Sequence, residues 1–311
     1  MDAGVRGLGS PSGHRKGAGG LTCGIVGLVS VDEPLTLGEV VAALESAYPP
    51  DTAMDWDHVG LVAGDLDQPV RLVHLAVDPT LAVVREAVDA GADLLVTHHP
   101  LLLRGIHSVA TAGAKGETLT RAILGDLAIY CAHSNADVAS PGVCDALAAA
   151  VGLTDVVPLE DVPYGLGRVG YLSAPMTLRA FADRVAAGLP ATVGGIRVSG
   201  DPEALVERVA VLGGSGDDHF GVVRAADVDV YVTADLRHHP ALEERETTRG
   251  GRPYIVDAGH WASEYVWLAS AERRLLEVVR GGSSRLDTVI STLRTEPWTF
   301  VVGANAANDQ G

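Results

Sequence analysis

Five histidine and carboxylate side chains lie just after predicted strands of this 311-residue chain: His98, His99, Asp137, His260 and Glu264. The segments that hold them, Thr-His-His-Pro, His-Ser-Asn-Ala-Asp and Gly-His-Trp-Ala-Ser-Glu, each follow a short apolar run. In open α/β sheets, ligands bind at the carboxyl ends of strands. We therefore predict that these five side chains form one site.

The spacing of His260 and Glu264 suits metal binding. They are four residues apart at the start of a predicted helix, so their side chains lie on one helix face about one turn apart. An imidazole and a carboxylate placed in this way could bind one ion or bridge two. A surface pair with a weak charge interaction is the alternative explanation.

The other three candidates are ambiguous when each is taken alone. His98 and His99 would point to opposite faces of a regular strand, but Pro100 favours a non-helical exit at which both rings could reach neighbouring ions. A buried histidine beside an exposed one would also explain the pair. Asp137 alone is better explained as a turn or N-cap residue before a helix that starts near Pro141.

The five side chains together indicate a two-metal site. Three imidazoles and two carboxylates are too many ligands for one structural ion, and they suit a pair of ions that share a carboxylate. Mixed nitrogen and oxygen ligation without thiolate favours zinc, iron, manganese, cobalt or nickel. We expect two divalent transition-metal ions per chain, which would activate water and leave positions open for substrate.

Weaker candidates surround this set. His133 could orient Asp137 or a bound water, or it could simply be packed in the core. Asp57, Asp235 and His239 could position substrate or move protons. Asp57, His133 and His239 are therefore the candidate catalytic residues.

A glycine-rich segment follows another predicted strand. Gly213-Gly214-Ser215-Gly216 could hold a phosphate with its backbone N–H groups, although a tight turn that needs glycine is the simpler explanation. The sequence contains no GxxxxGK[ST] motif, which excludes a Walker-type GTPase.

Strands and helices alternate along most of the chain, which predicts an α/β protein whose mainly parallel sheets are covered on both faces. We expect two interlocked α/β domains, at residues 36–155 and 165–303, with the dinuclear site in the cleft between them. The second includes a long helix over roughly 261–279. Residues 1–35 are expected to form a disordered extension and residues 304–311 a polar tail.

Composition limits the function. Hydrophobic residues make up 47% of the sequence and the formal net charge is −17, which argues against a broad nucleic-acid surface. A small anionic substrate remains compatible, because metal ions can outweigh the field of the protein. Three cysteines without a CxxC pair favour a reduced, cytoplasmic setting. The apolar run at residues 21–31 has no cleavage site after it, and we expect neither export nor a membrane segment.

The sequence resembles the dinuclear-metal-centre hexamer family, also called NIF-three-like and widely labelled GTP cyclohydrolase 1 type 2. The resemblance covers roughly residues 36–300. It rests on six segments in the same order: MDWDHVGLVAGD (54–65), ADLLVTHHPLL (92–102), AIYCAHSNADVA (128–139), VLGGSG (211–216), DVYVTADLRHH (229–239) and VDAGHWASE (256–264). Two positions depart from the family pattern, His58 in place of asparagine and Ala234 in place of glycine.

The resemblance implies a two-domain α/β fold, a toroidal homohexamer and metal ligands at the five positions named above, with Glu264 as the bridge. The family label implies hydrolysis of GTP, in which the purine is opened and formate is lost. A ring that stores, delivers or senses metal without catalysis would use the same ligands, so both functions remain open at the level of sequence.

Overall fold

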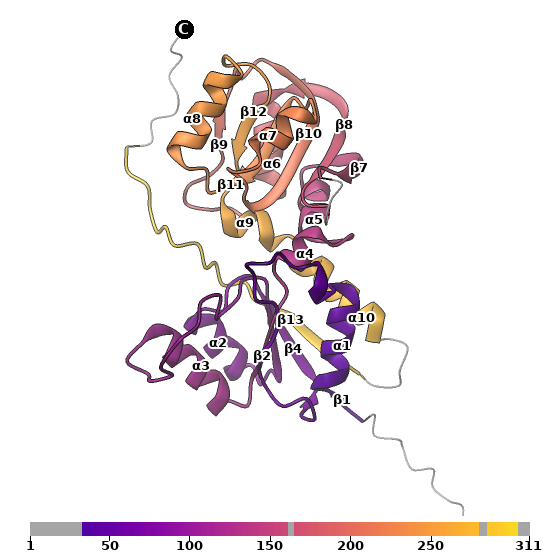
Figure 1. Ribbon diagram of the computed structural model, residues 1–311, viewed down its shortest axis with the longest axis vertical. Coiled ribbons are helices and arrows are strands. Elements are labelled where there is room, and N and C mark those ends of the chain that lie inside the picture. The colour runs from indigo at the N-terminus through magenta and orange to yellow at the C-terminus, as the bar shows by residue number, and fades with distance from the viewer. Residues whose placement is uncertain (1–32, 161–164, 280–284, 304–311) are drawn as a thin grey trace, which may run out of the picture. The chain divides into compact units, whose positions relative to one another are not determined.

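The computed structural model of the protein describes residues 33–160, 165–279 and 285–303 (Figure 1). The tail at 304–311 and all but the last three residues of the extension expected at 1–35 lie outside these ranges. Leu35 already belongs to strand β1 (Leu35–Thr36), which pairs with β3 (Pro69–Val70). Over the described ranges, every helix is too short or too polar to cross a membrane.

A five-stranded sheet carries the first histidine pair. Its strands are, in spatial order, β13 (Asp287–Ile290), β4 (Leu72–Ala76), β5 (Leu94–Thr97), β6 (Ala128–Cys131) and β2 (Gly60–Ala63). All neighbours are parallel except β2 and β6. Helices lie on both faces (Figure 1): α1 (Leu37–Ala47) and α10 (Leu268–Val279) on one, α2 (Leu81–Asp89) and α3 (Ala114–Leu124) on the other.

A six-stranded sheet carries the second histidine. Its strands are, in spatial order, β7 (Leu153–Pro158), β8 (Arg168–Thr177), β10 (Leu205–Ser215), β11 (Val230–Ala234), β12 (Tyr254–Asp257) and β9 (Arg197–Ser199). Only the β10–β11 and β11–β12 pairs are parallel. The α/β class is confirmed, but this sheet is mixed. The link from β7 to β8 is too short for the crossover that a parallel pair needs, so these two strands pair antiparallel.

The remaining helices connect or cover these strands: η1 (Pro50–Thr52), α4 (Ser134–Val138), α5 (Val143–Ala150), α6 (Leu178–Gly188), α7 (Phe220–Ala225), α8 (His238–Thr247) and α9 (His260–Tyr265). The single long helix predicted over roughly 261–279 is wrong, because α9 ends before α10 begins. At the break, Trp267 N–H bonds to the Glu264 carbonyl three residues back, and Ser270 N–H bonds to Trp267 in the same way. These tighter bonds interrupt the α-helical pattern.

The two sheets are not built from consecutive halves of the chain. Strand β13, late in the sequence, pairs in parallel with β4 of the five-stranded sheet. Helix α10 packs against α1 beside the same sheet. The segment α5–β7, which precedes residue 160, instead contacts β8 and β10 of the six-stranded sheet. A division of the chain near residue 160 therefore does not separate the two sheets.

Trp267 links the core to the histidine pair. Its side chain is fully buried, and its ring meets Tyr48 edge-on with centroids 5.6 Å apart. Its indole N–H donates to the Tyr48 hydroxyl at 3.2 Å. The same ring lies 5.4 Å from the ring of His98. The break between α9 and α10 thus places the largest buried side chain of this core behind a predicted ligand.

We expect Trp267→Ala to lower the free energy of unfolding by about 3–5 kcal/mol, because it empties a fully buried site. Urea unfolding followed by circular dichroism measures the loss. The matched control is Trp298→Ala, since Trp298 is exposed, and it should change stability by less than about 0.5 kcal/mol. Equal effects of the two substitutions would contradict the central position of Trp267.

Candidate metal site

His98 and His99 leave the end of β5 in an arrangement that a regular strand would not give. The His98 N–H still bonds to the Ala76 carbonyl and the His99 N–H to the Val77 carbonyl, so the backbone continues along the edge of β4. Both Nε2 atoms nevertheless face the carboxylate of Glu264, at 3.5 Å from His98 and 3.1 Å from His99. The sequence-based expectation that both rings serve one site agrees with this geometry.

His260 and Glu264 approach from α9. Gly259, with φ of 79°, occupies the left-handed region between β12 and the first residue of this helix, a conformation that glycine adopts at little cost. The His260 Nε2 lies 3.0 Å from the Glu264 carboxylate and 3.1 Å from the His99 Nε2. The i, i+4 spacing therefore places both side chains on one face, as predicted.

Asp137 completes the predicted set. It lies in the short helix α4, and its carboxylate is 3.6 Å from the His98 Nε2. It is not a helix cap, because α5 begins at Val143 after Gly142. Burial raises the pKa of Asp137 despite the nearby histidines. All five predicted ligands thus come together around Glu264 and His98.

Each of the three histidines has one ring nitrogen occupied and the other directed at the cluster. The Nδ1 of His98 bonds to the Ala132 carbonyl at 2.9 Å. The Nδ1 of His99 bonds to Asp78 at 2.7 Å, and that of His260 to Asp235 at 2.8 Å. An acceptor at Nδ1 holds a proton there and turns Nε2 toward the cluster, where a metal can bind it once that nitrogen has lost its proton.

Three buried atoms without partners test whether the residues fit a metal. The His98 Nε2, the Asp137 Oδ1 and the Glu264 Oε2 have no hydrogen-bond partner within the described part of the chain. Orphaned buried polar atoms are costly and rare. Metal–nitrogen and metal–oxygen bonds of about 2.0–2.2 Å place neighbouring ligands of one ion roughly 3.0–3.5 Å apart. The observed spacings of 3.0–3.6 Å match this requirement.

His133 also lies beside the cluster. Potential ligand atoms of His98, His99 and His133 lie within 4.8 Å of one another. Those of His99, His260 and Glu264 form a second such group. The His133 Nδ1 bonds to Asp57 at 3.0 Å. His133 therefore shares the pattern of the predicted ligands, with one nitrogen held by a carboxylate and the other available.

Asp57 is fixed from several sides. Besides His133, it accepts hydrogen bonds from the Ser134 N–H at 3.0 Å and the Ser134 hydroxyl at 2.5 Å. Burial alone would raise the pKa of Asp57, but the bonds from His133 and Ser134 outweigh burial and lower it. An ionised Asp57 orients the His133 ring.

His239, the third candidate catalytic residue, lies apart from the metal-ligand cluster. His239 is exposed in the first turn of α8 and belongs to neither histidine group of the described residues. Asp235, by contrast, adopts φ of 52° directly after β11 and bonds to His260. The left-handed residue is thus Asp235 itself, and Ala234 remains in the strand.

Sequence reasoning missed Asp78. This residue follows β4 and holds the His99 Nδ1, and it also accepts a hydrogen bond from the Thr295 hydroxyl. Its position after a strand was a usable signal. An Asp-Pro pair after a strand is also typical of a helix start, which conceals this second role.

The glycine-rich segment after β10 lies against the cluster. Gly214 has φ of 69°, and a Cβ built there would lie 2.4 Å from the Glu264 Oε1 and 3.2 Å from the His260 Nε2. Its N–H donates to the Ser263 hydroxyl at 2.9 Å. Close approach to Glu264 therefore explains this glycine, and its N–H is not free for a phosphate.

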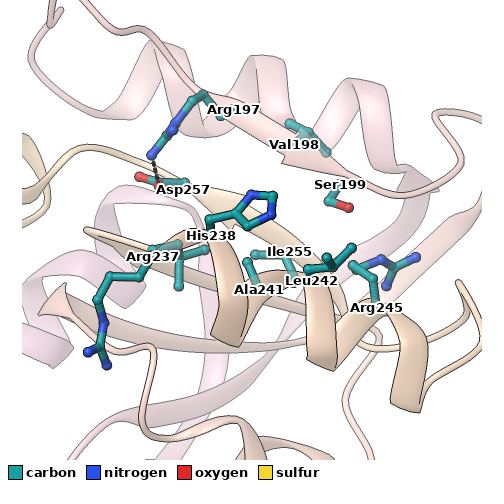
Figure 2. A pocket seen from close by; sticks show the side chains of 11 residues that line it. Arg197, Val198, Ser199, Arg237, His238, Ala241, Leu242, Arg245, Ile255 and Asp257 are labelled. Atoms are coloured by element: carbon teal, nitrogen blue, oxygen red, sulfur yellow. Dashed lines mark hydrogen bonds and ion pairs between the residues drawn. The ribbon is translucent and has the colours of Figure 1, made fainter.

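A cavity of about 810 Å³ opens onto the cluster. His99 and His260 line it, together with the two aspartates that hold their Nδ1 atoms and the segment around Trp298. A smaller pocket of about 310 Å³ between β9 and α8 shares Arg197, Leu236 and Asp257 with it (Figure 2). Ligand sites typically have volumes of about 300–1,000 Å³, so the larger cavity could take a small organic molecule next to the cluster.

Comparison with known proteins supports the resemblance. The sequence model of a family described as Duf34/NIF3 (NGG1p interacting factor 3) matches residues 35–297. A Streptomyces coelicolor protein named GTP cyclohydrolase 1 type 2 homolog is 49% identical, over 86% of this chain and 95% of its own. A Mycobacterium tuberculosis protein of the same name is 35% identical, over 85% of this chain and 97% of the length of that protein. A solved Bacillus cereus structure, related to NIF3, matches with a TM-score of 0.78 and 29% identity, over 86% of this chain and 99% of that one.

We expect metal affinity to rise steeply with pH. Burial lowers the pKa of His99 and His260, but the Glu264 charge and the aspartates outweigh it and raise these pKa values to about 10 and about 11. At neutral pH a metal must therefore displace protons from both rings, and its apparent affinity should increase by up to roughly tenfold per displaced proton per pH unit. Chelator competition with Co²⁺ at pH 6, 7 and 8 measures this slope. The exposed-site variant His107→Gln should keep it, and a flat profile would contradict it.

Gly214→Ala should weaken metal binding at least about tenfold, because the added Cβ displaces the Glu264 carboxylate and strains a left-handed backbone. Metal titration gives the affinity, and circular dichroism shows whether the fold is retained. Gly221→Ala is the matched control, since nothing lies within 4 Å of its Cβ. Unchanged affinity in Gly214→Ala would place the metal away from Glu264.

Proposed function

Because the chain belongs to the Duf34/NIF3 family, we propose that it is a dinuclear metal-binding protein and a metal-dependent hydrolase that acts on a nucleotide or a similar small molecule. The observation that carries this proposal is the open cavity of about 810 Å³ lined by His99 and His260. A protein that only stores metal has no need of a substrate-sized space beside the ligands. The non-enzymatic storage, delivery or regulatory ring is the alternative.

The proposed ligands are His98, His99, Asp137, His260 and Glu264. Glu264 would be the carboxylate shared by two divalent ions, since its Oε1 lies near the Nε2 atoms of His260 and His98 and its Oε2 near that of His99. Asp137 lies 3.6 Å from the His98 Nε2. The bound ions would supply Lewis acidity, which activates water for attack on an electrophilic carbon or phosphorus. The nitrogen and oxygen donors suit zinc, iron, manganese, cobalt or nickel.

Side chains outside the ligand set would transfer the proton of the attacking water. Asp57 holds the His133 Nδ1, and the His133 ring lies 5.1 Å from that of His98 and 5.5 Å from that of His99. We propose that His133 accepts a proton at Nε2 from the attacking water and returns it to the leaving group. Ser134 fixes Asp57 and thereby positions the ring. Asp57 and Ser134 are positioning residues, and His239 has no part in this scheme because it lies apart from both histidine groups.

The proposal includes a cytoplasmic homo-oligomer, with the hexamer as its form. Exposed apolar residues on the described surface, Ile123 and Leu124 of α3 among them, are compatible with contacts between copies. Closed symmetric assemblies are the usual form of soluble homo-oligomers.

Metal analysis and a substrate screen test the function. Protein purified without chelator should contain about two transition-metal ions per chain, and Glu264→Ala should lose them. The loaded protein should turn over at least one member of a panel of nucleoside triphosphates and phosphoesters, followed by phosphate or formate release. His133→Asn should keep its metal and lose turnover about 10²–10⁴-fold, whereas His107→Asn, at an exposed position, should behave as the parent.

Two ions per chain without turnover of any member of the panel would favour storage or delivery over hydrolysis. Loss of metal in His133→Asn to the same extent as in Glu264→Ala would make His133 a ligand and remove its proposed proton role. A reproducible content near one ion per chain would contradict the dinuclear site.

A further inference from the structure

We propose that the cavity beside the metal ligands binds a nucleotide through three side chains outside the ligand set. Trp298 stacks on the base, Glu296 accepts hydrogen bonds from N–H groups of the base, and Arg197 pairs with the phosphates. All three line the cavity. This inference rests on the proposed function and specifies the substrate class for the same site.

The segment that carries Trp298 is fixed relative to the metal ligands. The Thr295 hydroxyl donates to Asp78, and Asp78 in turn holds the His99 Nδ1. The preceding Arg294 donates to the Ala191 carbonyl at 3.3 Å. One carboxylate therefore orients both a predicted ligand and the start of the segment Thr295–Trp298. A molecule that contacts this segment is held at a defined place beside His99.

Trp298 has the exposure of a stacking platform. It is 67% exposed and lines a cavity, whereas Trp261 and Trp267 are buried. An exposed indole face offers apolar area to a planar ring, and stacking of a base on an aromatic side chain is worth roughly 5-fold to 150-fold in affinity. The rigid ring loses little conformational freedom when it binds. A planar heterocycle is the ligand group that uses this surface.

Glu296 supplies the complementary polar contact. It lies two residues before Trp298, is half-buried, and has no hydrogen-bond partner among the described residues. The other carboxylates of the cavity are engaged: Asp78 with His99, Asp235 with His260 and Asp257 with Arg197. A carboxylate accepts two N–H groups side by side. A base with two adjacent N–H donors, such as guanine, satisfies it better than adenine.

Arg197 is the cation available for the phosphates. It comes from the edge strand β9, is 68% exposed at its side chain, and is held by Asp257 through Nη2 (Figure 2). Its other N–H groups have no partner within the described ranges, and it is the one Arg or Lys lining this cavity. In Figure 2, the guanidinium groups of Arg237 and Arg245 point away from Arg197. A planar guanidinium binds phosphate oxygens in pairs.

Binding to the metal-loaded protein tests the three contacts separately. The probes are GTP, ATP, guanosine and inorganic tripolyphosphate, and calorimetry gives each affinity. Trp298→Leu should weaken GTP and guanosine about 10-fold to 100-fold and leave tripolyphosphate unchanged. Arg197→Met should weaken GTP and tripolyphosphate about tenfold or more and leave guanosine unchanged. Glu296→Gln should reduce the preference for GTP over ATP.

Matched controls occupy exposed positions outside the cavity. Phe300→Leu removes an exposed aromatic ring two residues from Trp298, and Arg85→Met removes an exposed arginine that also has one carboxylate partner, Glu117. Both should bind all four probes as the parent does. Light scattering on each variant reports whether the substitution changes assembly.

Several results would overturn the inference: no binding of GTP by the parent, equal losses for every probe, or a Trp298→Leu variant that changes assembly but keeps its GTP affinity. The last result would make the segment an interface between copies. The predicted binding pattern without turnover of any nucleotide would leave this inference standing and remove the hydrolase. Turnover of GTP with an unchanged KM in all three variants would support the hydrolase and remove the inference about these three side chains.

Discussion

The rest of the site depends on one buried carboxylate. Glu264 is almost fully buried, and three imidazole Nε2 atoms lie within 3.5 Å of it. Burial raises the pKa of Glu264, but the three histidines outweigh burial and hold it well below its usual value. A buried charge is tolerated only when it is paired or bound to metal. The position of α9, the glycine at 214 and the turn at Gly259 all serve to bring this carboxylate to the histidines.

The acceptors that orient those histidines come from neighbouring strand ends. Asp78 follows β4, Ala132 follows β6, and Asp235 follows β11. His98 and His99 themselves follow β5, between β4 and β6, and His260 follows β12, next to β11. Each imidazole is therefore held by the strand beside its own. The order of the strands therefore decides which ring nitrogen of these three histidines is turned toward Glu264.

Local patterns predicted the parts of the site better than they predicted the pairing of strands. The alternation of apolar runs with helical periodicity identified the α/β class and the strand ends, and those ends led to the five ligand candidates. Antiparallel pairs such as β7–β8 and the return of β13 to β4 depend on contacts between distant segments, which periodicity does not report. Asp78 was missed because Asp-Pro after a strand also signals the start of a helix. The approach of His133 to His98 depends on how β6 turns into α4, which local sequence patterns do not report.

The return of β13 to the first sheet constrains how the protein can fold during synthesis. The sheet formed by β4, β5, β6 and β2 has an open parallel edge at β4 until residues 287–290 leave the ribosome. By then, β10, β11, β12 and α9 have already emerged. An unpaired buried edge is a site for wrong pairing, and partly folded chains of this size expose such edges. Residues 287–290 must therefore emerge before β13 can pair with β4 and complete the five-stranded sheet. The six-stranded sheet has the opportunity to form first.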